Sequence, residues 1–506
     1  MRVGTAAGRW VIVAMVLGSG MAAIDATVVG IALPTIGREF GASLGPLQWV
    51  VTGYTLTLAA LLLVGGSLGD RYGRRRVFCV GVIWFALASA ACALAPGIDA
   101  LIITRILQGV GAALLTPGSL AILQASFAPE DRGRAIGAWS GLGGVATAAG
   151  PLLGGYLIAA ASWRWIFLIN VPIGAVVLLL AVRRVPESRD PTAAPRVDLA
   201  GAVLATCALG GATYGVIAGP TRGWGDPVVA AALALGVTAV VAFVIVERRS
   251  PAPMLPFSVF RSRQFTVTNA VTFIVYGALG GVLFLLPVEL QVVNGYSPLE
   301  SGLALLPLTG IMLLLSARSG RLATTIGPRL QMSVGPVVVG IGLALLARTS
   351  GGSPYVSGVL PAVTVFGLGL AAIVAPLTAT ALNSVPSDHA GLASAVNNDV
   401  ARLAALIAVA VLPTLSGITG ADYLDPSALS DGFRRAVLLC GALCMVGGIV
   451  AAFGIRNPPR PVTAVPGIRT APADIDCYTC ALDATPAVVA APAPSATGSD
   501  RGTTGR

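Results

Sequence analysis

The stretch GGSLGDRYGRRR, residues 65–76, places one aspartate and four arginines among glycines. An uncharged run from Val50 to Leu68 leads into it, and a second apolar run begins at Val77. A helix that crosses a bilayer needs roughly 20 apolar residues, and both flanking runs are about that long. We therefore interpret the charged stretch as a tight turn between two membrane-spanning helices.

The composition of the whole chain supports this interpretation. The 506 residues are 55% hydrophobic and only 11% charged, with a mean hydropathy of +0.85, whereas soluble proteins carry about 25% charged residues. We therefore expect an all-α integral membrane protein. The net charge of +10 comes from arginine alone, since the chain has no lysine. These arginines form short clusters rather than one basic face, so nucleic-acid binding is not expected.

Fourteen apolar runs predict fourteen transmembrane helices. The first run is too long for the hydrophobic part of a signal peptide and is interpreted as a span. The helices are expected near residues 10–34, 48–68, 77–95, 100–123, 135–158, 165–183, 197–219, 228–246, 267–289, 299–317, 332–348, 356–380, 396–419 and 435–455.

The arginines predict the orientation of these helices. With a cytoplasmic N-terminus, 24 of the 32 arginines fall in cytoplasmic loops and termini. Short cytoplasmic loops are enriched in arginine, and an even number of spans places both termini inside. Six arginines fall in outer loops, namely Arg38, Arg164, Arg222, Arg348, Arg434 and Arg435.

An internal similarity predicts two halves. GSLGDRYGRR at 66–75 has a weaker copy, GRLATTIGPR, at 320–329. Each copy would join the second and third helices of a six-helix unit, as in transporters built from parallel repeats, although chance similarity is the alternative. The expected domains are a six-span bundle (1–184), two additional spans (185–250), a second six-span bundle (251–456) and a disordered cytoplasmic tail (457–506).

Six motifs follow one another along the chain. They are IDATVVGIALP (24–34), GSLGDRYGRR (66–75), RILQGVGAA (105–113), GPLLGGYL (150–157), WRWIFLINVPIG (163–174) and SAVNNDVARLA (394–404). Together they resemble the major facilitator superfamily, and within it the fourteen-span drug:proton antiporters of the EmrB/QacA type. Gly30 departs from the asparagine usual at that position.

The resemblance implies the major facilitator fold and a proton-coupled efflux transporter in the cell membrane, not an enzyme. The transporter would export hydrophobic or amphipathic drugs, or one antibiotic, by alternating access. The alternatives are an importer of a small polar nutrient with the same fold, and a membrane sensor or scaffold without transport activity. The expected partners are a lipophilic small molecule, protons and the bilayer, and we expect a monomer.

Asp25 and Arg105 are charged residues inside predicted spans one and four, both in the outer half of the membrane. Isolated charges there are costly and usually pair inside the bundle, so we expect the two side chains to be neighbours, directly or through Gln108. A proton-coupling or substrate-binding centre is the functional interpretation, and the resemblance implies proton coupling for the arginine. A purely structural ion pair is the alternative.

Two glycine-containing motifs are candidate moving parts. The first motif is the charged turn, which either holds the two halves together in one access state as an ionic latch or only anchors the turn. Its residues are Asp70, Arg71, Gly73, Arg74 and Arg75. The second motif either forms a pliable seam between the halves, which moves during alternating access, or only allows close helix packing. Its residues are Gly150, Pro151, Gly154 and Gly155.

The substrate pocket has no motif of its own. Asp399 and Arg402 either form a salt bridge along one helix face or contribute to a pocket, and Glu289 is expected at the membrane interface. Pocket candidates are completed by Gln108 and the aromatic residues Tyr54, Trp139 and Tyr276. No metal or cofactor is expected, because His389 is the only histidine and Cys477 and Cys480 form a lone C-x-x-C pair.

Overall fold

The computed structural model describes residues 1–190, 198–250, 257–349, 353–385 and 390–457, and these residues form helices without any β-strand. The predicted tail over 457–506 lies outside this description except for Asn457. In chain order the elements are α1 (Ala6–Phe40), α2 (Leu44–Tyr72), α3 (Arg74–Ala93), α4 (Ile98–Ser126), α5 (Pro129–Ala160), α6 (Trp165–Leu168), α7 (Asn170–Arg184), α8 (Leu199–Arg222), α9 (Pro227–Arg249), η1 (Phe257–Arg261), α10 (Arg263–Val292), α11 (Pro298–Ala304), α12 (Leu306–Ile326), α13 (Pro328–Leu346), α14 (Val359–Leu382), α15 (Ala390–Ser416), η3 (Asp422–Leu424) and α16 (Pro426–Gly454).

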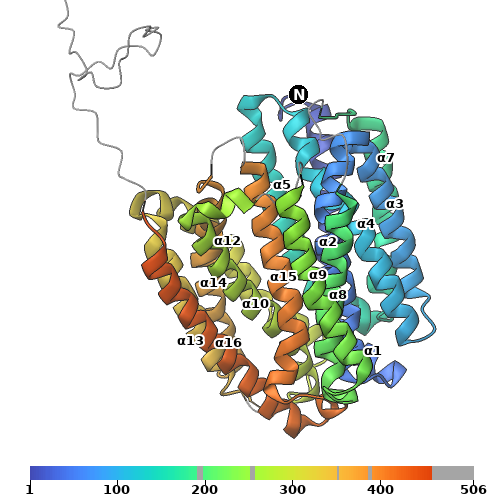
Figure 1. Cartoon of the computed structure of the whole chain (residues 1–506), viewed down its shortest axis with the longest axis vertical. Helices are drawn as coiled ribbons and strands as arrows, with labels where there is room; N and C mark the ends of the chain where they lie inside the picture. The colour runs from blue at the N-terminus through green and yellow to red at the C-terminus, as the bar shows by residue number, and fades with distance from the viewer. Residues whose placement is uncertain (191–197, 251–256, 350–352, 386–389, 458–506) are drawn as a thin grey trace, which may run out of the picture. The chain divides into compact units, whose positions relative to one another are not determined.

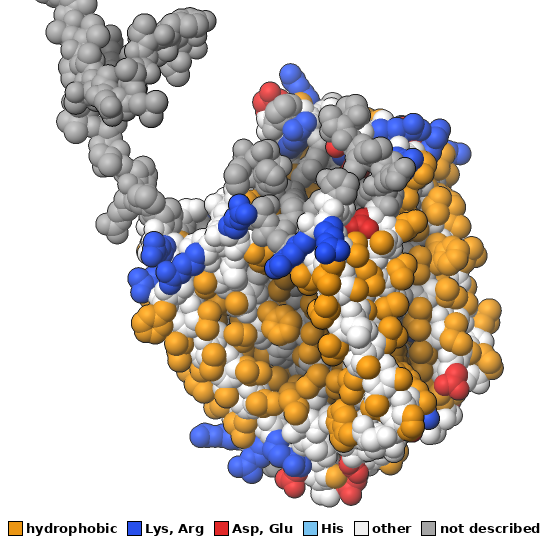
Figure 2. All heavy atoms as spheres, in the orientation of Figure 1, with side chains coloured by type: hydrophobic (Ala, Val, Ile, Leu, Met, Phe, Trp, Pro, Cys, Tyr) orange, Lys and Arg blue, Asp and Glu red, His pale blue; other side chains and the backbone are white. Residues whose placement is uncertain are grey.

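These elements include the fourteen predicted membrane spans. Fourteen helical segments in the described chain are long and apolar enough to cross a membrane, with α6 and α7 counted as one span and α11 and α12 as another. Figure 2 shows hydrophobic side chains over the middle of the molecule, with arginine and acidic side chains gathered toward its two ends. The chain is a multi-pass membrane protein.

Several helices extend well beyond the predicted apolar runs. The last helix begins at Pro426 rather than near residue 435, because Asp425 caps it by accepting hydrogen bonds from the N–H groups of Ser427 and Ala428. Arg434 and Arg435 therefore lie in the helix and not in a loop. Caps and polar end residues allow a helix to continue past the hydrocarbon layer, so hydropathy underestimates its length.

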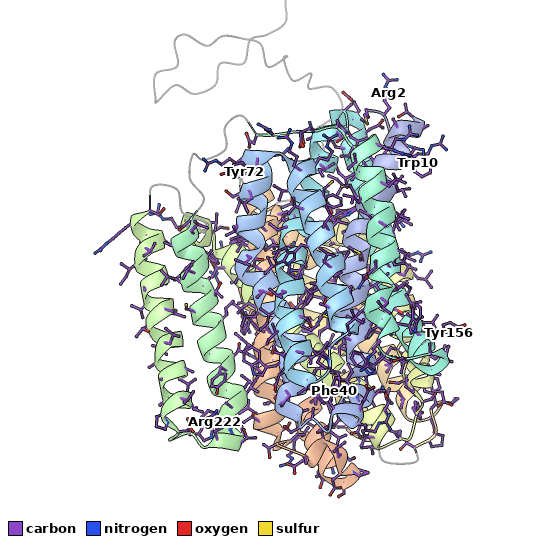
Figure 3. All side chains as sticks on the ribbon, turned by 90° about the vertical axis from the view of Figure 1, so that its right-hand side faces the viewer. Arg2, Trp10, Phe40, Tyr72, Tyr156 and Arg222 are labelled. Atoms are coloured by element: carbon purple, nitrogen blue, oxygen red, sulfur yellow. The ribbon has the colours of Figure 1, made fainter. Side chains whose placement is uncertain are left out.

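Helices α1–α7 pack mainly with one another, and so do α10 and α12–α16, whereas α11 packs mainly against α5. We call α1–α7 the N-half and α10–α16 the C-half. Helices α8 and α9 pack against each other, and α8 also contacts α2 and α15. Figure 1 shows this pair in front of the junction between the halves, and Figure 3 shows it standing out from the bundle. The extra pair thus covers one side of the junction.

The molecule has two loop faces. Arg2 and Tyr72 lie at one end of the bundle and Arg222 and Phe40 at the other (Figure 3). We call the end where α1 begins and α16 ends the terminal face, and the opposite end the distal face.

The two halves are joined near the distal face. There Gln48 Nε2 donates to the carbonyl of Val409 across 2.6 Å and to that of Ala410 across 3.2 Å. Further hydrogen bonds between the halves run from Gln291 Nε2 to the Ile31 carbonyl (3.0 Å), from the Leu44 N–H to the Gly420 carbonyl (3.0 Å) and from the Tyr423 hydroxyl to the Ala42 carbonyl (2.6 Å).

The hydrophobic core follows the same division. One buried cluster combines distal parts of α1, α2 and α4 with residues of the C-half. A second cluster contains the terminal-face parts of α1 to α5 and α7 without any residue of the C-half, and a third joins η1, α10, α14 and α15 within the C-half. In the described chain, therefore, core packing unites the halves distally and remains separate toward the terminal face.

Candidate functional site: a buried charge network in the N-half

An ion pair between α1 and α4 lies inside the N-half. Arg105 Nη1 donates to Asp25 Oδ2 across 2.5 Å, and each side chain is no more than 1% exposed. Arg105 Nε also donates to the Val50 carbonyl of α2, across 3.0 Å. The expected contact between Asp25 and Arg105 is present and direct. Because both charges are withdrawn from water, each depends on the other for compensation.

Three polar side chains complete the network. Gln108 accepts from Arg105 Nη1 across 2.6 Å and donates through Nε2 to Asp25 Oδ1 across 2.8 Å. Asn170 Nδ2 donates to Asp25 Oδ1 across 3.2 Å and to Ser89 Oγ across 2.9 Å. The Asp25 carboxyl group therefore accepts hydrogen bonds from three side chains, those of Arg105, Gln108 and Asn170.

Tyr54 forms the wall of the network on the α2 side. The Arg105 guanidinium carbon lies 4.3 Å from the centre of the Tyr54 ring, within the range of a cation–π interaction. Tyr54 is 2% exposed, so it packs within the N-half. Its hydroxyl group donates to the Ala22 carbonyl of α1 across 3.4 Å. Tyr54 thus connects α2 with both α1 and α4.

Sequence reasoning missed Ser89 and Asn170. Asn170 is a polar residue within an otherwise apolar span, and that signal was available in the WRWIFLINVPIG motif. Ser89 carries no such signal, because serine is common in membrane helices and bonds readily to its own backbone. Here Ser89 Oγ donates to the carbonyl of Phe167, across 2.9 Å.

The glycine–arginine turn at 65–76 packs against the segment that follows α7. Asp70 forms a salt bridge with Arg74 at 2.7 Å. Glu187 Oε1 accepts from the backbone N–H of Arg75 across 3.0 Å, and Arg75 Nη1 donates to the Val185 carbonyl across 3.1 Å. These contacts stay on the N-terminal side of the chain, so the predicted latch to the other half is not formed by them in this conformation.

Two further features define the turn. Gly73 has φ 115°, and a Cβ atom there would lie 2.8 Å from Glu187 Oε1, so a larger residue would be strained. Arg71 is exposed and lies over the ring of Tyr72, at 5.2 Å. Glu187 was missed because nothing in its local sequence predicts contact with a turn more than 100 positions away.

The weaker copy of the turn makes matching contacts. Gly327 also has a positive φ, 85°. Asn457 Oδ1 accepts from the backbone N–H of Arg329 across 3.0 Å, and Arg329 Nε donates to the Ala452 carbonyl across 2.7 Å. In each half, therefore, a side chain that follows the last helix accepts a hydrogen bond from the backbone N–H at the same position of the turn. This correspondence is what two copies of one repeat would show.

The α5 motif lies where the two halves meet. A Cβ atom at Gly154 would lie 2.9 Å from Val28 Cγ1 of α1, and one at Gly155 would lie 2.6 Å from the Pro298 carbonyl oxygen of α11. Gly150 faces Thr27 of α1, and Gly302 of α11 packs against the backbone of Pro151. The glycines thus allow α5 to approach α1 on one side and α11 on the other.

The remaining pocket candidates are dispersed. Trp139 Nε1 donates to Ser19 Oγ across 2.8 Å, on the terminal side of α1. Tyr276 is half-buried on α10. Asp399 and Arg402 form no salt bridge in the described chain, and Asp399 Oδ1 is buried without a hydrogen-bond partner. Only Gln108 and Tyr54 of the proposed pocket residues join the network around Asp25.

Glu289, which was expected near the membrane interface, is covered by protein and only 1% exposed. The reason is tertiary: α10 continues to Val292, and its last turns are covered by α16 and η3.

Residues 15–410 match the sequence model of the Major Facilitator Superfamily. The chain belongs to the Major Facilitator Superfamily.

Several curated superfamily proteins are similar in sequence. The tetracenomycin C resistance and export protein of Streptomyces glaucescens is 36% identical over 80% of this chain and 75% of its own length. The puromycin resistance protein of Streptomyces alboniger is 38% identical over 84% of this chain and 86% of its own. The multidrug resistance protein Stp of Mycobacterium tuberculosis is 36% identical over 91% and 88%, respectively.

Solved structures agree with the major facilitator fold. A bacterial homologue of the human lysosomal transporter Spinster superposes with a TM-score of 0.64 at 16% identity and covers 89% of this chain and 97% of its own. The peptide transporter POT gives the same TM-score over 87% of this chain.

In this superfamily member the described residues contain no group of three or more histidine, cysteine, aspartate or glutamate side chains arranged to hold a metal ion. His389, Cys477 and Cys480 lie outside the described residues.

Proposed function

We propose that this transporter exports a hydrophobic or amphipathic drug or antibiotic across the cytoplasmic membrane in exchange for protons. Similarity to proteins named for antibiotic resistance, multidrug resistance and export supports the direction and the substrate class. The buried pair of Asp25 and Arg105 is the observation that carries proton coupling. The protein then works by binding and conformational change, as a monomer without a cofactor, and not as an enzyme.

The chemistry of Asp25 suits reversible proton binding. Its carboxyl group accepts hydrogen bonds here from Arg105, Gln108 and Asn170. A proton on the carboxylate would cancel the charge that attracts Arg105 and turn an acceptor into a donor. Because Arg105 also reaches α2 through Val50 and Tyr54, protonation of Asp25 would change the packing of three N-half helices, including α2, which contacts α15.

The packing of the halves supports alternating access. The arginine-rich terminal face is the cytoplasmic one in this proposal. The halves are joined at the distal face and packed separately toward the terminal face, so this conformation would admit a substrate from the cytoplasm. A proton reaching Asp25 from outside, in the opposite conformation, would accompany substrate release.

The remaining candidate residues have supporting roles. The proposed substrate pocket contains Tyr276, Trp139, Asp399 and Arg402. Gln108 and Tyr54 connect this pocket to Asp25. The seam along which α5 moves against α11 consists of Gly150, Pro151, Gly154 and Gly155. The turn at 65–76 holds the two halves together in the opposite conformation, as a latch.

The proton gradient supplies sufficient energy. A membrane potential of about 150 mV provides roughly 3.5 kcal/mol for one inward proton. This energy supports a substrate gradient of about 300-fold.

Transport by proteoliposomes with an imposed pH gradient tests the proposal. A panel of dyes and antibiotics, with puromycin included, is assayed with the wild-type protein, Asp25→Asn and a control, Asp99→Asn, whose exposed acid lies at the start of α4. We expect the pH gradient to drive transport in the wild type and the control but not in Asp25→Asn. Equal transport by Asp25→Asn would refute the coupling role, and nutrient uptake without drug transport would favour an importer.

A further inference from the structure

A second acid, Glu289, is buried in the C-half, and no charged side chain among the described residues pairs with it. The residue is 1% exposed, and within the described chain neither of its carboxyl oxygens has a hydrogen-bond partner. Ser430 of α16 interacts with the carboxyl group, but it forms no hydrogen bond of ordinary geometry. This setting differs from that of Asp25, whose carboxylate is fully satisfied. An ionised carboxylate without partners is very unfavourable in such a place, so the packing around Glu289 fits the neutral acid.

Charged residues on the neighbouring elements do not compensate Glu289. Helix α10 packs against α1, α11, α14, α15, α16, η1 and η3. In the described chain no side chain of these elements forms a hydrogen bond of standard geometry with either carboxyl oxygen of Glu289. The charged residues nearest the distal ends of these elements are Arg38, Glu39, Glu300, Asp422, Asp431, Arg434 and Arg435.

Several of these charges are engaged elsewhere. Glu39 pairs with Arg164 at 2.7 Å. Asp422 accepts from Thr419 across 2.9 Å, and Arg435 Nε donates to the Asp431 carbonyl across 3.2 Å. Rearrangement of one of these groups toward Glu289 would break an existing contact.

Glu289 lies close in sequence and structure to the contacts that join the halves. Gln291, two residues further along α10, donates to the Ile31 carbonyl of α1 across 3.0 Å. The segment before α16 supplies the Tyr423 hydroxyl and the Gly420 carbonyl for the contacts with Ala42 and Leu44. Both α16 and η3, which contains Tyr423, pack against α10.

We propose that Glu289 is a second proton-binding site, whose neutral form closes the distal face and whose ionisation opens it. Loss of the proton places a charge among α10, α16 and η3, and that charge requires water. Entry of water at this position loosens the segment that carries Gly420 and Tyr423, and with it the contacts between the halves.

This site differs from Asp25 in its role. The distal face is its nearest solvent, so its proton exchanges with the outside in both directions and is not carried across the membrane. The proposal presupposes alternating access but not the coupling role of Asp25. Acidic conditions outside would therefore favour return to the conformation described here.

The sign of the pH dependence follows from proton linkage. The closed distal face binds one more proton than the open one at this site, so closure is favoured at low pH and lost as the pH rises. For one linked proton the ratio of closed to open forms falls by up to about tenfold for each pH unit.

The test measures the distance between two spin labels on the distal face. Leu94 of the N-half and Val356 of the C-half are 78% and 72% exposed, and each is replaced by a labelled cysteine in a full-length protein without native cysteines. Distances are recorded in lipid nanodiscs between pH 5 and pH 9. We expect the long-distance fraction to grow with pH in the wild type and to stay small at every pH in Glu289→Gln, which imitates the neutral acid.

Two further variants make the result decisive. Glu300→Gln, an exposed acid on α11 whose capping role glutamine can keep, should respond like the wild type. Asp25→Asn should keep the Glu289-dependent part of the pH response of the label distances. This result separates failure of the Glu289 inference from failure of the coupling proposal for Asp25. An unchanged pH response in a monodisperse Glu289→Gln protein would overturn the inference, as would loss of the response in Glu300→Gln.

Discussion

The hydroxyl group of Tyr423, in the segment before α16, donates a hydrogen bond to the backbone carbonyl of Ala42, between α1 and α2, across 2.6 Å. Tyr423 is completely buried, and the two residues belong to opposite halves. The bond can exist only while the distal face is closed, so it contributes to the balance between the two access states.

Removal of this hydroxyl should shift that balance. A hydrogen bond contributes about 0.5–1.5 kcal/mol net, so Tyr423→Phe is expected to raise the open fraction at the distal face about 2- to 12-fold. The labels at Leu94 and Val356 report the change. Tyr355→Phe is the matched control, since among the described residues that hydroxyl makes only a 3.5 Å contact within the C-half, to the Ala304 carbonyl. Identical distance distributions for wild type and Tyr423→Phe would contradict the prediction.

The charge pair predicts a stability effect that does not depend on transport. Arg105→Gln leaves the Asp25 carboxylate buried without its cation, which costs about 3–5 kcal/mol. We expect a clearly lower unfolding temperature for Arg105→Gln in detergent. The double variant Asp25→Asn with Arg105→Gln should regain much of this stability but not proton-driven transport. Equal unfolding temperatures for the single and double variants would show that the charges do not compensate each other.

The turn at 65–76 offers a test of backbone strain. Gly73 has φ 115°, and its missing Cβ would meet Glu187, so Gly73→Ala should destabilise the protein by about 1–3 kcal/mol. Gly69→Ala is the control, because Gly69 is helical and the nearest atom to a Cβ there is 3.8 Å away. Thermal unfolding should separate the two variants, with Gly69→Ala near the wild type. A Gly73→Ala protein as stable as Gly69→Ala would be inconsistent with the turn geometry.

The α5–α11 contact predicts a packing effect at the seam. A methyl group at Gly155 would lie 2.6 Å from the Pro298 carbonyl oxygen, and overpacking of this kind costs about 1–3 kcal/mol. Gly155→Ala should therefore open the distal face and slow transport severalfold. Gly144→Ala on the same helix is the control, because no atom of the described residues lies within 4 Å of a Cβ there. In Gly155→Ala, both the distance between the distal labels and the transport rate should change. In Gly144→Ala, neither should change.

The sequence by itself determined the number of spans, the positions of the charged turns and the pairing of Asp25 with Arg105. These features are local, or follow from the high cost of an isolated charge in a membrane. A run of about 20 apolar residues specifies a transmembrane helix wherever it occurs, and two buried charges of opposite sign at similar depth have few other partners.

Only the tertiary structure decided which face each helix turns toward its neighbours. A helix that is apolar all round has no hydrophobic stripe from which its rotation can be predicted. The convergence of Ser89 and Asn170 on Asp25 therefore could not be derived, nor could the contact of Glu187 with Arg75. The burial of Glu289 has the same origin, because a residue near the end of an apolar run is exposed or buried according to what packs over it. Here α16 and η3 cover it, and both come from a part of the chain more than 100 residues away.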